Sequence, residues 1–153
     1  MPVEIERKFL VTGDGWRQGQ GETLQQGYLS LDPERSVRIR VAGDRAWLTI
    51  KSGSKGLARA EYEYEIPAEH AREMLASLCP NSPIEKTRYR VDDHGLTWEV
   101  DEFFGDNAGL VMAEVELQSA DQAVDLPDWV GEEVSADPRY YNASLIQHPF
   151  SSW

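Results

Sequence analysis

Hydrophobic and polar residues alternate with a period of two along most of this 153-residue chain, a pattern that is typical of β-strands. Short turn-forming sequences such as Ala42-Gly43-Asp44 and Asp92-Asp93-His94-Gly95 separate the alternating segments. We therefore predict eight strands, at residues 3–11, 23–31, 36–41, 45–51, 59–66, 84–91, 97–104 and 110–118.

Two segments follow a helical spacing instead. Pro67 opens the first, which carries Ala71, Met74, Leu75 and Leu78 and ends at Cys79-Pro80. The second covers residues 142–148, and a short turn is expected around residues 126–130. The expected fold class is α+β but mainly β. It is an eight-stranded antiparallel β-barrel, or tunnel, with two or three flanking helices, in a single domain over residues 1–153.

The charged residues occupy every second position of these strands, which places each set on one face. Glu4, Glu6 and Lys8 share a face of the first strand, while Val3 and Ile5 share the other. The corresponding sets of later strands are Arg38 and Arg40; Arg59, Glu61 and Glu63; Lys86, Arg88 and Arg90; Glu99 and Asp101; and Glu114 and Glu116.

A solvated outer face explains any one of these strands. The set as a whole separates charge by sign, and like charges two residues apart repel each other unless a counter-charged ligand lies between them. A dry charged interior would cost several kcal/mol per ion, whereas a wet tunnel holding an anion and metal ions removes that cost. Arginine and lysine bind phosphate oxygens, and clustered carboxylates suit Mg²⁺ or Mn²⁺. The pattern thus predicts a metal–polyphosphate site.

The formal net charge of −12 disfavours duplex nucleic acid and anionic membranes as partners. The single cysteine, Cys79, excludes an intrachain disulfide, and no apolar run approaches the length of a membrane span. The first residues are charged and lack the apolar core of a signal peptide. We expect a soluble, cytoplasmic protein. Its oligomeric state is open, and a homodimer would cover outward apolar residues such as Tyr62 and Tyr64.

EIERK at residues 4–8 resembles the ExExK signature of the CYTH superfamily, also called triphosphate tunnel metalloenzymes. Further segments match in order: VRIR (37–40), LTIK (48–51), RAEYE (59–63), EKTRYR (85–90), WEVDEF (98–103), AEVEL (113–117) and YYNASL (140–145). The resemblance implies an eight-stranded tunnel, an enzyme and a metal requirement. The chain is most similar to the short bacterial members that hydrolyse inorganic triphosphate to phosphate and pyrophosphate.

By this resemblance, each charged set acquires an expected role. Glu4, Glu6 and Glu116 are candidates for a first metal, and Glu114 is a candidate for a second metal or for orienting the attacking water. Glu61 and Glu63 are candidates for a second metal or for orienting the attacking water, and Lys8 for positioning the scissile end. The expected triphosphate-binding residues are Arg38, Arg40, Lys51, Arg59, Lys86, Arg88 and Arg90. Tyr28, Glu99 and Asp101 are further candidates.

The sequence leaves several alternatives open. A class IV adenylate cyclase and a thiamine triphosphatase would use the same anionic tail of their substrates. A polyphosphate- or nucleotide-binding module would use the tunnel without turnover, although simple anion binding needs fewer carboxylates. A lipocalin-like barrel would require apolar residues on the faces assigned inward.

Overall fold

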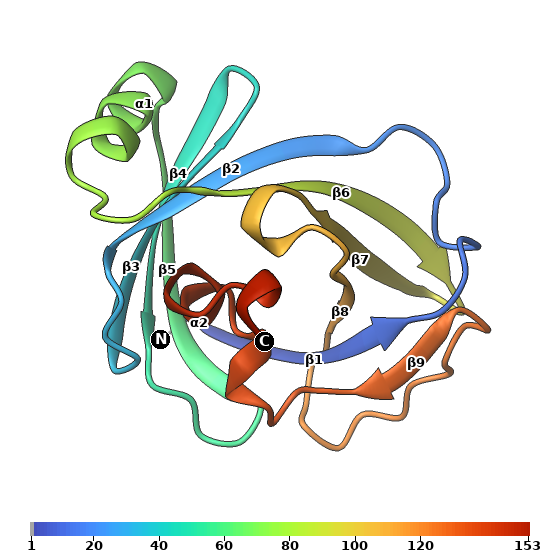
Figure 1. Ribbon diagram of the computed structural model, residues 1–153. Coiled ribbons are helices and arrows are strands. Elements are labelled where there is room, and N and C mark those ends of the chain that lie inside the picture. The colour runs from blue at the N-terminus through green and yellow to red at the C-terminus, as the bar shows by residue number, and fades with distance from the viewer. Residues whose placement is uncertain (1) are drawn as a thin grey trace.

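Strand β1 (Val3–Val11) closes the barrel because it pairs with two neighbours at once. Along one edge it runs antiparallel to β8 (Val111–Glu116), with Glu6 opposite Glu116. Along the other it pairs with β5 (Ala58–Pro67), with Glu4 opposite Arg59. A computed structural model, which describes residues 2–153, shows the resulting ring of strands (Figure 1).

The remaining strands complete this ring in antiparallel pairs. They are β2 (Glu22–Ser30), β3 (Arg35–Ala42), β4 (Arg45–Ser52), β6 (Ile84–Asp93) and β7 (Leu96–Phe103). The order around the barrel is β5-β4-β3-β2-β6-β7-β8-β1, and β1 returns to β5. The predicted eight-stranded antiparallel barrel is therefore confirmed, with strand ends within about two residues of the predicted ones.

Turn chemistry explains the tightest hairpins. Asp93 pairs with Leu96, so His94 and Gly95 alone connect β6 to β7. Both turn residues have positive φ, 49° and 77°, which matches the two-residue turn favoured by the twist of paired strands. Gly43, with φ of 63°, begins the similarly short connection from β3 to β4.

A ninth strand was not predicted from the sequence. β9 (Val130–Glu133) pairs with the second half of β1, where β5 no longer does. The expected turn is present only at residues 128–129, and Val130 already belongs to the strand. At four residues, with Gly131 inside it, β9 is too short to show clear alternation.

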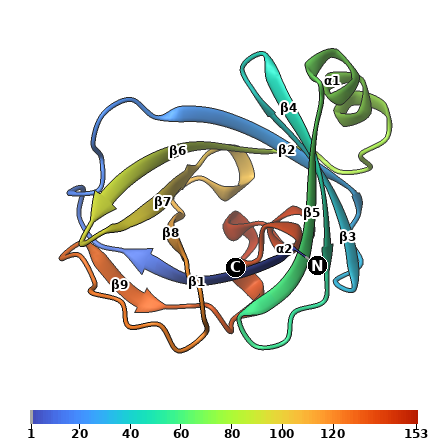
Figure 2. The same cartoon turned by 180° about the vertical axis from the view of Figure 1, so that it is seen from behind.

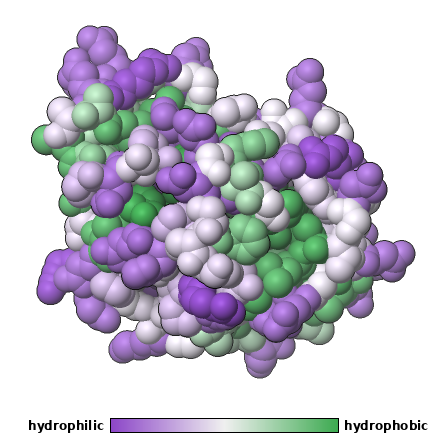
Figure 3. All heavy atoms as spheres, in the orientation of Figure 1, coloured by the Kyte–Doolittle hydropathy of each residue, from purple (hydrophilic) through white to green (hydrophobic). Residues whose placement is uncertain are grey.

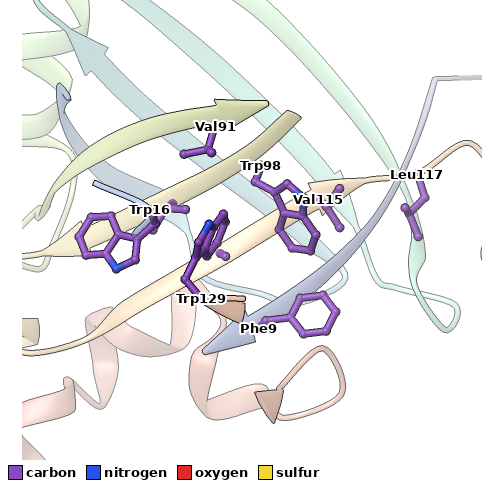
Figure 4. Close-up of a cluster of buried hydrophobic side chains, with 9 residues drawn as sticks. Phe9, Trp16, Val91, Trp98, Val115, Leu117 and Trp129 are labelled. Atoms are coloured by element: carbon purple, nitrogen blue, oxygen red, sulfur yellow. The ribbon is translucent and has the colours of Figure 1, made fainter. Parts of the chain in front are cut away.

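The largest apolar cluster lies outside the ring of strands. Phe9, Trp98, Val100 and Val115 point away from the charged faces of β1, β7 and β8. Trp16 and Trp129 cover this cluster from the 12–21 and 117–129 connections (Figure 4). The ring centroids of Phe9 and Trp98 lie 5.6 Å apart in a tilted contact, and those of Trp98 and Trp129 lie 5.7 Å apart in an edge-on contact. The barrel is thus stabilised from its outer surface, which leaves its interior free for charge.

Helix α1 (Ala68–Ser77) covers a second part of the outer surface (Figure 2). Its Ala71 and Leu75 pack against Ile39, Val41 and Ala46 of β3 and β4. Gly27 of β2 permits the close approach, since a Cβ there would lie 2.9 Å from Leu75 Cδ2. Elsewhere the face shown in Figure 3 mixes hydrophilic residues with separate apolar patches.

Helix α2 (Asn142–Gln147) lies within the ring of strands in both ribbon views (Figures 1 and 2). Its Leu145 joins a third apolar cluster with Ile84, Phe103 and Met112, whose side chains share the inner face with the charged residues. One end of the barrel is therefore filled by apolar side chains and this helix. Short 3₁₀ turns precede and follow α2 at Pro138–Tyr140 and Phe150–Ser152, and another lies at Gly105–Asn107. None of the helices within residues 2–153 has the length and apolar character needed to cross a membrane.

Candidate active site in the barrel tunnel

The charged faces of the strands point into the barrel. Two adjoining cavities of about 330 and 290 Å³ run through it and share a set of charged wall residues: Glu4, Glu6, Arg38, Arg40, Lys51, Arg88 and Glu114. The first cavity ends against α2 and also contacts Lys8, Arg59 and Lys86. The second ends in a more acidic mouth with Glu61, Glu63, Glu99 and Glu116. The structure thus brings together nearly all the residues that alternation placed on the inner faces.

Four cations form what we call the basic wall: Arg38 and Arg40 on β3, and Lys86 and Arg88 on β6. Arg40 makes no ion pair within residues 2–153, and its Nε donates instead to the amide oxygen of Gln26 at 3.0 Å. Burial, with Arg38 and Arg88 nearby, lowers the pKa of Arg40 to about 9. The basic wall therefore holds positive charge that the described protein does not neutralise.

Arg38 of the basic wall carries an unsatisfied donor. Its Nε is buried and has no hydrogen-bond partner within residues 2–153. A buried donor without an acceptor costs roughly 1–3 kcal/mol. Such a donor in a polar cavity points to an acceptor that the protein itself does not supply, and a phosphate oxygen is a suitable one.

Asp101 lies behind the basic wall and does not line either cavity. It accepts two hydrogen bonds from Arg88, at 2.8 and 2.9 Å, and pairs with Lys86 at 2.8 Å. These two cations outweigh burial and hold the pKa of Asp101 well below its ordinary value. Its carboxylate is fully engaged in orienting Arg88 and Lys86.

Four carboxylates form what we call the acidic wall: Glu4 and Glu6 on β1, and Glu114 and Glu116 on β8. In the order of the ring, β1 lies four strands from β2, the strand between the two strands of the basic wall. The two walls therefore face each other across the tunnel. A triphosphate on the basic wall would have carboxylates on its other side, and carboxylate oxygens are ligands of the kind that divalent cations prefer.

The residues of the acidic wall differ in how well they are neutralised. Glu4 accepts hydrogen bonds from Lys51 at 3.0 and 3.1 Å. Although burial opposes its charge, the neighbouring Glu61 and Lys51 lower the pKa of Glu4 to about 2. Burial and the charge of Glu4 raise the pKa of Glu61 to about 7. Burial disfavours the charge of Glu114, but Lys8, which pairs with it at 3.5 Å, helps to hold its pKa below the ordinary value.

Glu6 has no such partner. It forms no ion pair within residues 2–153, while Glu116 faces it across the β1–β8 pairing. Burial, reinforced by Glu114 and Glu4, raises the pKa of Glu6 to about 8. Glu6 thus has uncompensated negative charge, just as the basic wall has uncompensated positive charge. A divalent cation bound to Glu6 would compensate it.

The donor set fits a hard divalent cation. Carboxylate oxygens are the ligands that Mg²⁺ and Mn²⁺ prefer, and the acidic wall offers no competing sulfur or imidazole ligand. Within residues 2–153 no three acidic, histidine or cysteine side chains are already drawn together as a closed metal site. The acidic wall therefore supplies carboxylate ligands, but these carboxylates are not already gathered around a single metal position.

The remaining predicted residues also have definite positions. Glu63 accepts a hydrogen bond from Thr49 at 2.8 Å and lies 3.6 Å from Arg38. Arg59 reaches Glu4 at 3.6 Å. Glu99 pairs with Arg88 and Arg90, each contact being longer than 3.2 Å. Tyr28 is buried and lines the first cavity.

Sequence reasoning missed the uncharged members of the site. Gln26, Thr49 and Asn142 all line the tunnel or bond its cations. Gln26 and Thr49 share an inner face with Tyr28 and Lys51, so their positions in the alternation carried a signal. The sequence reasoning considered only charged residues and therefore did not select them.

A model of the CYTH domain matches residues 2–149 of this sequence. The chain belongs to the CYTH family. This CYTH protein is 47% identical over 154 residues to an inorganic triphosphatase of Acetivibrio thermocellus, covering 100% of this chain and 99% of that one. It is 40% identical over 148 residues to an inorganic triphosphatase of Nitrosomonas europaea, covering 94% of this chain and 96% of that one.

Solved structures agree with the fold of this CYTH protein. A crystal structure of an inorganic triphosphatase superposes with a TM-score of 0.66 at 38% identity, covering 93% of this chain and 96% of the other. A putative adenylyl cyclase from Hippeastrum, described as having a dominant triphosphatase activity, superposes with a TM-score of 0.60. At 15% identity over 78% of this chain and 80% of that one, the second likeness shows the fold alone.

Proposed function

We propose that this CYTH protein hydrolyses inorganic triphosphate to phosphate and pyrophosphate with the help of a divalent metal. The observation that carries the proposal is the incompletely neutralised basic wall: within residues 2–153, Arg40 has no carboxylate partner and Arg38 Nε has no acceptor. Relatives of nearly the same length, at 47% and 40% identity, are inorganic triphosphatases by name. The function predicted from the sequence agrees with these relatives.

The basic residues would bind the polyanion. Besides the basic wall we assign this role to Lys51, Arg59 and Arg90, of which Lys51 is the most buried and Arg90 lies at the open mouth. Lys8, which donates to the Tyr140 carbonyl oxygen at 3.2 Å, would position the scissile end of the triphosphate. Because phosphoryl transfer depends mainly on positioning and charge stabilisation, no covalent nucleophile is required.

The family is metal-dependent, and we propose Mg²⁺ or Mn²⁺ as the ion in this protein. Glu4, Glu6 and Glu116 would hold it, with Glu114 as a further ligand candidate. When bound, a divalent cation neutralises phosphoryl oxygens and polarises water. The raised pKa of Glu6, together with the absence of an ion pair to it within residues 2–153, supports this assignment.

The glutamates of the acidic mouth would orient and deprotonate the attacking water molecule. We assign Glu61 and Glu63 to orienting a water molecule at the terminal phosphorus, or to holding a second metal. The oxygen of that water forms a bond to phosphorus while the P–O bond to the bridging oxygen breaks, and pyrophosphate leaves with the electron pair. A Glu61 oxygen would accept the proton of the water. Glu99 lies close enough to Arg88 to help orient it.

A substrate panel tests the proposal. We expect the highest kcat/KM for tripolyphosphate among tripolyphosphate, thiamine triphosphate and ATP, each assayed with Mg²⁺ and with Mn²⁺. No phosphate release from tripolyphosphate, together with cyclic AMP formation from ATP, would favour the adenylate cyclase alternative. Tight binding of tripolyphosphate without turnover would favour the binding module.

We further propose that the chain works as one domain in the cytoplasm and forms a homodimer. Ile50 faces Tyr62, and Leu48 faces Tyr64, on the outer surface of β4 and β5, where Tyr64 is 58% exposed. A second copy would cover this apolar face. The net charge of −12 supports the absence of nucleic-acid and membrane partners, and a single cysteine is compatible with a reducing compartment.

A further inference from the structure

Two uncharged amides connect the ends of the basic wall. Arg40 Nε donates to Gln26 Oε1 at 3.0 Å, and Gln26 Nε2 donates to Asn142 Oδ1 at 2.9 Å. Lys86 Nζ donates to the same Asn142 oxygen at 3.0 Å. Four side chains, from β3, β2, α2 and β6, thus form one continuous chain of hydrogen bonds, in which Gln26 is fully buried.

The chemistry of the two ends fixes the orientation of both amides. Arginine and lysine can only donate hydrogen bonds, so Gln26 turns its oxygen to Arg40 and Asn142 turns its oxygen to Lys86. The Gln26 amide nitrogen then finds its acceptor in that same Asn142 oxygen. Neither amide can rotate by half a turn without placing one donor against another.

Gln26 holds Arg40 without neutralising it, whereas Lys86 is held both by Asn142 and by its ion pair with Asp101 at 2.8 Å. Asp101 orients Arg88 and Lys86 through its charge, and each such pair reduces the positive charge offered to a ligand. An amide oxygen fixes the side chain but leaves its full charge in place. Arginine and lysine side chains otherwise move among many rotamers, and a ligand that binds them has to remove this freedom.

We propose that Gln26 and Asn142 are positioning residues that hold Arg40 and Lys86 ready for the triphosphate. This role rests on the proposed function. Because Asn142 is the first residue of α2, the acceptor for Lys86 comes from the C-terminal helix. The basic wall is therefore completed only when α2 lies in the end of the barrel.

The test compares Gln26→Met and Asn142→Ala with two controls of the same residue types, Gln25→Met and Asn81→Ala. Gln25 lies next to Gln26 on the other face of β2, and Asn81 is exposed beyond α1. We expect KM for tripolyphosphate with Mg²⁺ to rise about tenfold in each test variant while kcat changes less than about threefold. The controls should match the wild type in both constants.

A double variant and a binding measurement sharpen the outcome. Because both residues act through one chain, Gln26→Met/Asn142→Ala should raise KM little more than either single change does. Calorimetric titration with tripolyphosphate, without metal, should show the same loss of affinity.

Test variants that keep wild-type KM and affinity, or that lose only kcat, would overturn the positioning role. A wild type that binds tripolyphosphate without hydrolysing it would overturn the proposed function instead, and the binding data would still decide the role of the amides. A wild type that does neither would overturn both.

Discussion

At the scale of single residues, the tunnel is defined by groups that lack partners inside the protein. Glu6 has no cation, Arg40 has no carboxylate, and Arg38 Nε has no acceptor within residues 2–153. Each of these carries a cost that a bound metal and a bound polyanion would remove. This free-energy cost arises at the same side chains that we assign to binding the metal and the triphosphate.

Glu6→Gln should remove most of the activity. The amide keeps the size of the side chain but loses the charge that a divalent cation needs. We expect kcat with tripolyphosphate to fall about 100-fold at saturating Mg²⁺, measured as phosphate release. Glu69→Gln, on the exposed side of α1, is the matched control and should behave as the wild type. Full activity and unchanged metal dependence in Glu6→Gln would contradict the assignment.

The raised pKa of Glu6 also predicts how stability depends on pH. The folded, metal-free protein holds the Glu6 proton up to about pH 8, whereas the unfolded chain releases it near its ordinary value of about 4.3. The folded state therefore binds more protons in this window, and its stability falls as the pH rises through it.

Urea unfolding in the presence of EDTA measures this effect. Between pH 5 and pH 8 the wild type should lose about 3–4 kcal/mol more unfolding free energy than Glu6→Gln does. The comparison of the two proteins isolates Glu6 from Glu61, whose pKa is also raised, and from Glu4, whose pKa is lowered. If the unfolding free energies of the two proteins change with pH in parallel, the pKa of Glu6 is not raised.

At the scale of elements, stability and function lie on opposite sides of the same strands. Side chains of β3 and β4 alternate between the tunnel and the cluster under α1, so that Arg40 points inward and Ile39 and Val41 point outward. Damage to an outer cluster should therefore reduce stability without changing the tunnel.

Leu75→Ala tests this separation. Leu75 of α1 is 7% exposed and packs against the outer face of the barrel. Its truncation should lower the unfolding free energy by about 2–4 kcal/mol, while kcat and KM at 25 °C stay within about twofold. Leu78→Ala, at a 60% exposed position just after α1, should change neither property. A loss of activity in still-folded Leu75→Ala would show that α1 influences the tunnel.

At the scale of the whole molecule, the barrel reverses the usual arrangement of a globular fold. Its interior is charged, and its main apolar clusters lie around the strands and at one end. Sequence alternation was sufficient to predict the barrel and the inward direction of the charges, because sign separation is visible at every second residue. It could not show which charges find partners, since the pairing of Asp101 with Lys86 and Arg88 depends on strand register.

Other features were beyond the sequence for different reasons. The four residues of β9 are too few for a periodic signal. Gln26 and Asn142 lie 116 residues apart and are uncharged, and only the docking of α2 brings them into contact. The roles of Trp16 and Trp129 as an outer cover also depend on how two connections fold back over the barrel.

The exposed tyrosines of β5 give a prediction about assembly. If a second copy covers Tyr62 and Tyr64, sedimentation velocity should show a dimer, and Tyr62→Ser/Tyr64→Ser should sediment as a monomer that stays folded. Gln118→Ser, at an exposed position outside this face, is the control. A wild-type monomer at high micromolar concentration would contradict the homodimer and leave the tunnel chemistry unaffected.

Phosphorus NMR of tripolyphosphate mixed with the protein tests the central claim most directly. With Mg²⁺ or Mn²⁺ present, the tripolyphosphate signals should give way to phosphate and pyrophosphate in equal amounts, and EDTA should stop the change. Signals that persist with either metal, or turnover that continues unchanged in EDTA, would contradict a metal-assisted triphosphatase in this tunnel.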